Sequence, residues 1–329
     1  MNAMGPDMDR AREMHAKKGY RSYKGPLLEG PRFSIDSKDS AFPRALSLIP
    51  DPPDRLYAIG NLEALSEGLA VIGARNATPY GLSCAGRFAR LAAEQGIPII
   101  SGGAYGCDAA AHAAALDVGG KTVVFLGGGC DQLYPPAHQP LFQRVIDGGG
   151  VVVSEHEWSY PALPFTFRNR NRLIAGLARA TLIVEAGMPS GTFSTADEAL
   201  SAGKEVLVVP GSICSRFSAG SNRLLYQGAT PIVDDESFHD AILSIFGCFA
   251  VQDGQSAFKA GAVRNAPKPD PLLDALCAQP MRMDQILADQ TLLAKKGGGT
   301  GELMVRLAEL EGKGLIGRYP DGRYGPVVH

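Results

Sequence analysis

The sequence has little that would bind a metal ion or cross a membrane. Its six cysteines are scattered, without a Cys-x-x-Cys pair or a metal-ligand spacing, which favours free thiols in a reducing compartment. No apolar run reaches the ~18 residues that a membrane-spanning helix needs, and the polar N-terminus does not resemble a signal peptide. We therefore expect a cytoplasmic protein with no metal site and no membrane association.

The motifs of common nucleotide-binding enzymes are also missing. No Gly-Lys-Ser/Thr occurs, so there is no Walker A loop, and no G-x-G-x-x-G follows the first predicted strand. ATP hydrolysis and dinucleotide binding thus lose their main sequence support, and we expect no cofactor. The histidines have no Ser or Cys partner at a catalytic spacing, so the sequence favours a binding protein over an enzyme.

The chain also lacks a strong net charge. Its 32 basic and 34 acidic residues give a formal charge of −2, which by itself disfavours a nucleic-acid-binding protein. The distribution of charge is uneven, however, because residues 158–184 contain four arginines and no acid. This segment is therefore a candidate for contact with an anionic ligand.

Short apolar runs alternate with longer Ala- and Leu-rich stretches of helical spacing. The runs that predict buried strands are 69–73, 97–101, 122–126, 151–154, 181–184 and 206–209. Continuous apolar strands alternating with helices are typical of a parallel sheet covered on both faces. With right-handed crossovers, this pattern predicts an α/β fold with an extended Rossmann-like, doubly wound, mostly parallel sheet over residues 69–245.

The segments that flank this domain have other patterns. Residues 1–68 are expected to form an N-terminal lead-in, truncated or irregular, with a short helix near 62–65. Residues 246–268 are rich in Ala, Gln, Gly, Lys and Pro, which predicts a linker. Residues 269–329 are expected to form three short helices and a hairpin turning at Asp321-Gly322, which is the outline of a small winged-helix domain.

Small, glycine-rich turns follow several of the predicted strands. Ligands of a doubly wound sheet bind beyond the carboxyl ends of its strands. Glycine and a helix N-terminus together let a phosphate group approach the backbone. The turn residues expected to form such a phosphate-binding surface are Gly73, Ser101, Gly102, Gly103, Gly106, Ser190, Gly191 and Thr192.

Arginines and aromatic residues accompany these turns. Arg75 follows the first predicted strand, where its guanidinium could fork onto a phosphate. Residues 165–172 read Phe-Thr-Phe-Arg-Asn-Arg-Asn-Arg, and the three arginines would point one way if the segment were extended. Its candidate site residues are Phe167, Arg168, Arg170, Asn171 and Arg172. Since aromatic rings stack on unpaired bases, the cluster predicts a single-stranded DNA site.

Through these residues the chain resembles the DNA-processing protein A family (DprA, also called Smf). The resemblance runs in order through residues 71–81, 101–112, 129–135, 170–177, 184–192 and 210–229. It implies an extended Rossmann domain that binds single-stranded DNA without catalysis. It also implies loading of the RecA recombinase onto that DNA during natural transformation, and a homodimer formed through the Rossmann domain.

The chain departs from the family pattern in three places. Cys107 stands where the family usually has Ile or Leu, and Pro136 and His138 stand where relatives often have Lys and Asn. We expect the helical N-terminal domain of many relatives to be absent, cut short or divergent here. In the C-terminal part, residues 268–329 carry eight basic and eight acidic residues, which favours a protein-contact role for the predicted winged helix over DNA reading.

Two other functions stay open. Residues 188–195 resemble the Pro-Gly-Gly-x-Gly-Thr-x-x-Glu turn of the lysine-decarboxylase-like phosphoribohydrolases, which are nucleotide-processing Rossmann enzymes. Thr195 stands where that turn has its glutamate, and Glu198 comes one helical turn later, so the acid–base group of the hydrolysis is missing. A passive nucleotide sensor is the remaining alternative.

Overall fold

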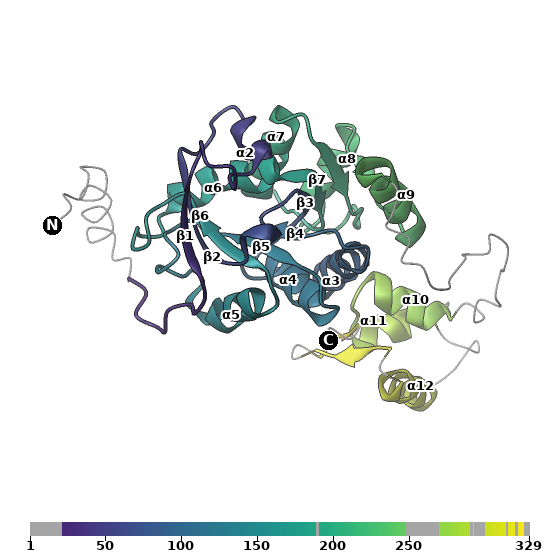
Figure 1. Ribbon diagram of the computed structural model, residues 1–329. Helices are drawn as coiled ribbons and strands as arrows, with labels where there is room; N and C mark the ends of the chain where they lie inside the picture. The colour runs from purple at the N-terminus through teal and green to yellow at the C-terminus, as the bar shows by residue number, and fades with distance from the viewer. Residues whose placement is uncertain are drawn as a thin grey trace, which may run out of the picture. The chain divides into compact units, whose positions relative to one another are not determined.

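A computed structural model describes residues 22–188, 191–247, 270–289, 292, 300–313, 315–319 and 322–325. The chain divides into two compact units. The larger unit is built on a sheet of nine strands, and the smaller one contains the C-terminal helices (Figure 1). Each unit is described by itself.

The sheet of the larger unit has the strand order β1-β2-β6-β5-β4-β3-β7-β8-β9. The strands are β1 (Arg32–Asp36), β2 (Arg55–Gly60), β3 (Gly68–Ile72), β4 (Ile99–Ser101), β5 (Thr122–Phe125), β6 (Val151–Ser154), β7 (Ala178–Ile183), β8 (Glu205–Val208) and β9 (Thr230–Pro231). Neighbouring strands from β6 to β9 pair in parallel, whereas β1, β2 and β6 pair antiparallel. The predicted Rossmann-like, mostly parallel sheet is confirmed.

Helices cover both faces of this sheet (Figure 1). The helices of the unit are α2 (Arg44–Ser47), α3 (Pro79–Glu94), α4 (Cys107–Asp117), α5 (Gln139–Asp147), α6 (Pro164–Leu177), α7 (Gly191–Ser201), α8 (Ala219–Tyr226) and α9 (Asp235–Phe246). Helices α3, α4 and α5 lie on one face, and α2, α6 and α7 lie on the other. The chain changes face because β4 joins one side of β3 and β7 joins the other. The carboxyl ends of β3 and β7 therefore form the topological switch point of the sheet.

The segment before residue 69 is part of the sheet. Strands β1 and β2 continue the sheet beyond β6, and Leu56 and Ile59 of β2 are fully buried. The prediction of an irregular lead-in is wrong at these strands. In β1, apolar and polar residues alternate, which is the pattern of an edge strand, whereas β3, β5 and β6 are continuous apolar runs buried along their whole length. The predicted short helix is present as a 3₁₀ turn, Leu62–Ala64.

The smaller unit contains three helices and a two-stranded ribbon. Its elements are α10 (Pro271–Ala278), α11 (Met283–Ala288), α12 (Thr300–Gly312), β10 (Gly317–Arg318) and β11 (Tyr324–Gly325). The two strands pair antiparallel, and leucine and isoleucine side chains from the helices form a separate core. The predicted elements are thus present, although Asp321 of the predicted turn lies outside the described residues. Their assignment to a winged helix stays a prediction.

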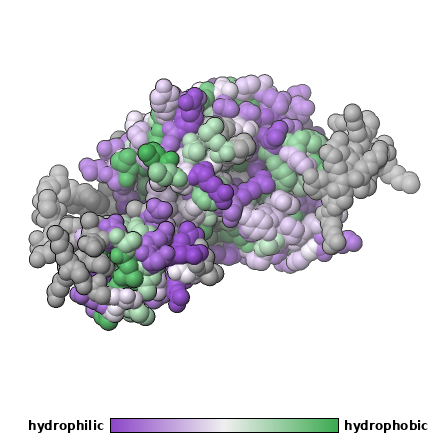
Figure 2. Space-filling model, turned by 180° about the vertical axis from the view of Figure 1, so that it is seen from behind, coloured by the Kyte–Doolittle hydropathy of each residue, from purple (hydrophilic) through white to green (hydrophobic). Residues whose placement is uncertain are grey.

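The surface of the chain is mixed in hydropathy. On the face opposite to that of Figure 1, hydrophilic residues lie between small groups of hydrophobic ones (Figure 2). Within the described part of the chain, no helix has both the length and the apolar character that crossing a bilayer requires.

Candidate nucleic-acid interface

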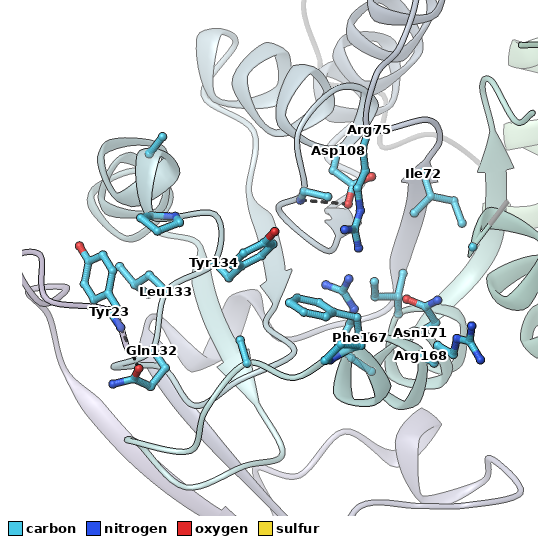
Figure 3. Close-up of a pocket in the computed structure, with 18 of the residues that line it drawn as sticks. Tyr23, Ile72, Arg75, Asp108, Gln132, Leu133, Tyr134, Phe167, Arg168 and Asn171 are labelled. Carbon is cyan, nitrogen blue, oxygen red and sulfur yellow. Dashed lines mark hydrogen bonds between the residues drawn. The ribbon is translucent and has the colours of Figure 1, made fainter. Parts of the chain in front are cut away.

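A cavity of about 1280 Å³ lies at the carboxyl ends of β3 and β7 (Figure 3). Gly73 and Arg75, which directly follow β3, line it, and so do Phe167 of α6 and Gly191 at the start of α7. The cavity thus occupies the switch point, where doubly wound sheets bind their ligands. Its volume exceeds the ~300–1,000 Å³ of pockets for drug-sized molecules, which favours a larger ligand.

The lining of this cavity is positively charged. Its basic residues are Lys24, Arg75, Arg168 and Arg170, and Asp108 is the one carboxylate among the described lining residues. Lys24, Arg75 and Arg168 are exposed, and no ion pair between described residues involves any of them. Three cations are therefore available to an anionic ligand in a chain whose net charge is −2.

Arg170 lies at the inner end of the cavity and is only 5% exposed. Its Nη1 donates to the carbonyl oxygen of Gly102 at 2.8 Å and to the carbonyl oxygen of Phe125. Burial lowers the pKa of the guanidinium to about 10, so it stays charged at neutral pH. Arg170 therefore connects the turn that follows β4 to the end of β5.

The turn after β4 is shaped around this arginine. A Cβ atom on Gly102 would collide with Nη1 of Arg170, so glycine here makes room for the guanidinium. The Asp108 carboxylate accepts hydrogen bonds from the backbone N–H groups of Gly102 and Ala104, both at 3.2 Å. Burial raises the pKa of Asp108. Gly106, which directly precedes α4 as its N-cap, has φ +78°, a backbone conformation that favours glycine.

Aromatic rings form the outer part of the cavity. The guanidinium of Arg75 stands 5.5 Å from the ring centre of Phe167, and the rings of Phe167 and Tyr134 are 5.1 Å apart (Figure 3). Tyr134 is 44% exposed, and Phe167 is partly buried. A cation beside accessible rings can contact a phosphate and a base of the same strand.

The arginine-rich segment is helical. Residues 165–172 belong to α6 and are not extended, so the condition under which their three arginines would point one way is not met. Residues two apart on a helix are about 200° apart around its axis. As a result, Arg170 points inward, whereas Arg168 and Arg172 lie on the other side of the helix. Arg168 is exposed at the cavity, and Arg172, one turn further along, is not among the lining residues.

Arg172 is engaged by two carboxylates. Its guanidinium donates to both carboxylate oxygens of Glu155, at 2.7 and 3.1 Å, and to Asp51 at 2.8 Å. The side chains of Arg172 and Glu155 are 12% and 15% exposed. These bonds hold the guanidinium next to Glu155, which directly follows β6.

The cavity brings together part of the predicted site. The predicted residues that line it are Gly73, Arg75, Phe167, Arg168, Arg170, Asn171, Gly191 and Thr192. Those that do not line it are Ser101, Gly102, Gly103, Gly106 and Arg172. Ser190 lies outside the described residues. Contact of any of these residues with DNA stays a prediction.

Several lining residues were not predicted. Tyr134 appeared only within the family motif, and Tyr23, Lys24 and Gln132 carried no sequence signal, because their positions depend on contacts between distant segments. Thr195 lines the cavity and is 3% exposed. It stands where the phosphoribohydrolase turn would have its glutamate.

Comparison with known proteins places this chain in a family. A family model described as DNA recombination-mediator protein A matches residues 34–242. The chain belongs to this family. It is 34% identical over 298 residues to Protein Smf of Escherichia coli K12, which covers 90% of this chain and 78% of that protein. The resemblance noted in the sequence is therefore confirmed.

Solved structures of the family have the same fold. DNA processing protein A of Streptococcus pneumoniae is similar with a TM-score of 0.59 and 33% identity, covering 70% of this chain and 77% of that one. DNA processing protein A of Helicobacter pylori, described for its unique single-stranded DNA binding mode, has a TM-score of 0.60 and 30% identity. That comparison covers 66% of this chain and 97% of the other.

Proposed function

We propose that the chain binds single-stranded DNA in the cavity at the switch point and loads the RecA recombinase onto it during natural transformation and recombination. The observation that carries this proposal is the cavity lining, which combines exposed, unpaired cations with accessible aromatic rings. Family membership and the Helicobacter pylori relative support the same ligand. The chain acts by binding and not by catalysis.

The arrangement suits a single strand. Phosphates would pair with Arg75 and Arg168, and bases would stack on Phe167 and Tyr134. Stacking of this kind is worth about 1–3 kcal/mol per base and needs bases that are free of a complementary strand. A duplex hides those base faces inside its helix, so we expect weaker binding of double-stranded DNA.

The test is the charge reversal Arg75→Glu, compared with Arg90→Glu on the exposed surface of α3 as a matched control. Arg75→Glu should weaken single-strand binding by at least tenfold. It should also flatten the dependence of log affinity on log salt by about 0.7 for each phosphate that the variant no longer neutralises. Mobility shifts with single- and double-stranded oligonucleotides at two salt concentrations measure both effects. Equal affinity and salt dependence in Arg75→Glu and the wild type would refute the proposal.

The role of the smaller unit is proposed as protein contact. In α12, Arg306 pairs with Asp270 at 2.7 Å and with Glu309 at 2.8 Å, so its charge is neutralised and not offered to a phosphate. Deleting residues 264–329 should leave single-strand affinity within about tenfold of wild type, since the cavity cations remain. A larger loss of affinity would mean that this unit contacts DNA directly.

RecA loading and dimerisation complete the proposal. The chain should accelerate RecA filament assembly on single strands that are already coated with a single-strand-binding protein, and Arg75→Glu should not. Light scattering should give the mass of a homodimer, and the mass should persist after deletion of residues 264–329, because the Rossmann domain carries the proposed interface.

A further inference from the structure

An N-terminal strap, residues 22–31, runs from the cavity to the start of β1. It lies upstream of the segment that the family model matches, residues 34–242. Its first part, residues 22–26, lines the cavity, together with Gln132 and Tyr134 on the neighbouring loop. The wall that contains Tyr23 therefore continues the cavity beyond the aromatic rings (Figure 3).

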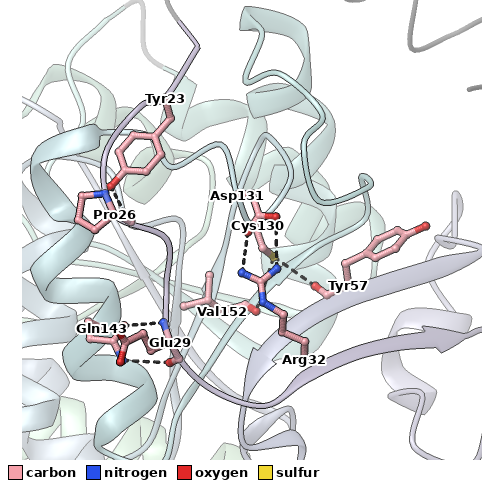
Figure 4. A network of polar contacts seen from close by, with 9 residues as sticks. All are labelled: Tyr23, Pro26, Glu29, Arg32, Tyr57, Cys130, Asp131, Gln143 and Val152. Carbon is pink, nitrogen blue, oxygen red and sulfur yellow. Dashed lines mark hydrogen bonds and ion pairs between the residues drawn. The ribbon is translucent and has the colours of Figure 1, made fainter.

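Side-chain amides hold the strap in place, Gln132 near its start (Figure 3) and Gln143 further along (Figure 4). Gln132 Oε1 accepts hydrogen bonds from the Ser22 hydroxyl at 2.9 Å and from the backbone N–H of Tyr23 at 3.0 Å. Further along, Gln143 accepts from the backbone N–H of Glu29 at 2.9 Å and donates to its carbonyl at 3.0 Å. Both glutamines are more than a hundred residues away in sequence.

Packing and an ion pair fix the other end of the strap. Leu28 is 3% exposed and belongs to the core formed with β2, β5, β6 and α5. Arg32, the first residue of β1, forms two hydrogen bonds to Asp131, at 2.7 and 3.2 Å (Figure 4). Its guanidinium also lies over the ring of Trp158. The strap is thus anchored at several points and forms a fixed wall of the cavity.

This wall has the chemistry of a nucleic-acid contact. Lys24 is exposed and lines the cavity, and no carboxylate in the described part of the chain pairs with it. Tyr23 lines the cavity with its ring partly buried against the core, and its hydroxyl donates to the Pro26 carbonyl at 2.9 Å. Lys24 directly follows Tyr23 in the chain, so this wall offers both a cation and an aromatic ring to the cavity, as Arg75 and Phe167 do elsewhere in its lining.

We infer that the strap is a second contact site for the same DNA strand, in which Lys24 binds a phosphate and Tyr23 contacts the adjoining base or sugar. This inference rests on the proposed function, because a strand held at Arg75 and Phe167 is what continues toward the strap. The strap then sets how many nucleotides the cavity engages.

The test measures affinity against strand length. Oligothymidylates of about 4 to 16 nucleotides, the usual range of site sizes for single-strand-binding domains, are titrated into the wild type, Lys24→Ala and Lys24→Glu. Lys38→Ala, an exposed lysine outside the cavity lining, is the matched control. A further variant, Gln132→Ala, removes the acceptor that holds Ser22 and Tyr23. Thermal unfolding checks that each variant is folded.

We expect Lys24→Glu to lose about tenfold in affinity for the long strands and to bind the shortest strand like the wild type. For long strands, Lys24→Ala should reduce the slope of log affinity against log salt concentration (the salt slope) by about 0.7. Gln132→Ala should shift the length at which affinity levels off to a shorter strand. Wild-type affinity of both Lys24 variants at every length would overturn the inference while leaving the proposed function intact. An equal loss at all lengths would also overturn it. Absence of single-strand binding by the wild type would instead refute the proposed function.

Discussion

The inner and outer ends of the cavity use the same residue type for different purposes. At the inner end, Arg170 is buried and donates to two backbone carbonyls next to Asp108. At the outer end, Arg75 and Arg168 are exposed and have no carboxylate partner among the described residues. The difference shows that one arginine-rich segment can contain both a buried arginine that supports the fold and an exposed arginine that is available to a ligand.

The largest expected effect is at the inner end. Arg170→Met should lower the free energy of unfolding by about 3 kcal/mol, because it leaves two buried carbonyl oxygens without a donor. Urea unfolding, followed by the fluorescence of the single tryptophan, Trp158, reports on the larger unit. Arg168→Met is the matched control and should stay within about 0.5 kcal/mol of wild type. An equal decrease in both variants would abolish the distinction between the two ends.

Arg172 tests a third position on the same helix. Arg172→Met should cost about 2 kcal/mol of stability, since it removes hydrogen bonds to a half-buried carboxylate. Single-strand affinity should change little, because Arg172 does not line the cavity. A double-mutant cycle with Glu155→Gln measures the coupling between the two side chains. A large decrease in DNA affinity with unchanged stability would show that Arg172 is a contact residue after all.

The stability of the larger unit should also respond to pH through His112 of α4, which does not line the cavity. This side chain is fully buried, with Nδ1 2.5 Å from the Thr122 hydroxyl oxygen, and burial lowers its pKa from 6.5 to about 3. Below pH 6.5 the unfolded chain binds a proton that the folded chain does not, so stability falls as the pH falls toward 3. The slope due to this residue approaches about 1.4 kcal/mol per pH unit.

The comparison of wild type with His112→Gln isolates that slope. The variant should have a flatter loss of stability on acidification from about pH 6 to pH 4, measured by urea unfolding. Burial also lowers the pKa of His156 and raises that of Asp108, and these opposite contributions are common to both proteins. Parallel curves for the two proteins would mean that His112 does not titrate in this way.

The smallest expected effect is at the outer end. Arg168→Ala should leave the free energy of unfolding within about 0.5 kcal/mol of wild type, because the side chain is exposed and unpaired in the described chain. It should lower single-strand affinity a few-fold and the salt slope by about 0.7. An unchanged salt slope would remove Arg168 from the proposed contact surface.

Strand patterns explain how much of the fold was predictable. Strands buried on both faces are continuous apolar runs, so the central parallel sheet could be predicted from the sequence. Strand β1 alternates polar with apolar residues because it lies at the edge of the sheet. Strand β2 lies between β1 and β6, but it begins with the exposed Arg55 and includes the partly buried Tyr57, and both strands were missed. Helix α6 did carry a start signal, since Pro164 occupies its first turn and the Thr166 hydroxyl accepts from the Leu163 N–H.

The site was predictable only where position along the chain determines position in space. Arg75 follows a strand that ends at the switch point, so its place in the cavity follows from the topology. The direction of Arg170 depends on the phase of α6, which the sequence pattern did not reveal. Lys24 reaches the cavity through contacts of its segment with Gln132, and no local pattern encodes such a contact.

The strap has a consequence for how variation within the family should be read. The matched family segment begins at residue 34, yet residues 22–26 line the cavity. Two members can therefore be equally similar over that segment and still differ in this wall. Sequence changes before residue 34 would then alter how many nucleotides the proposed site contacts, while the turns at the switch point stay the same.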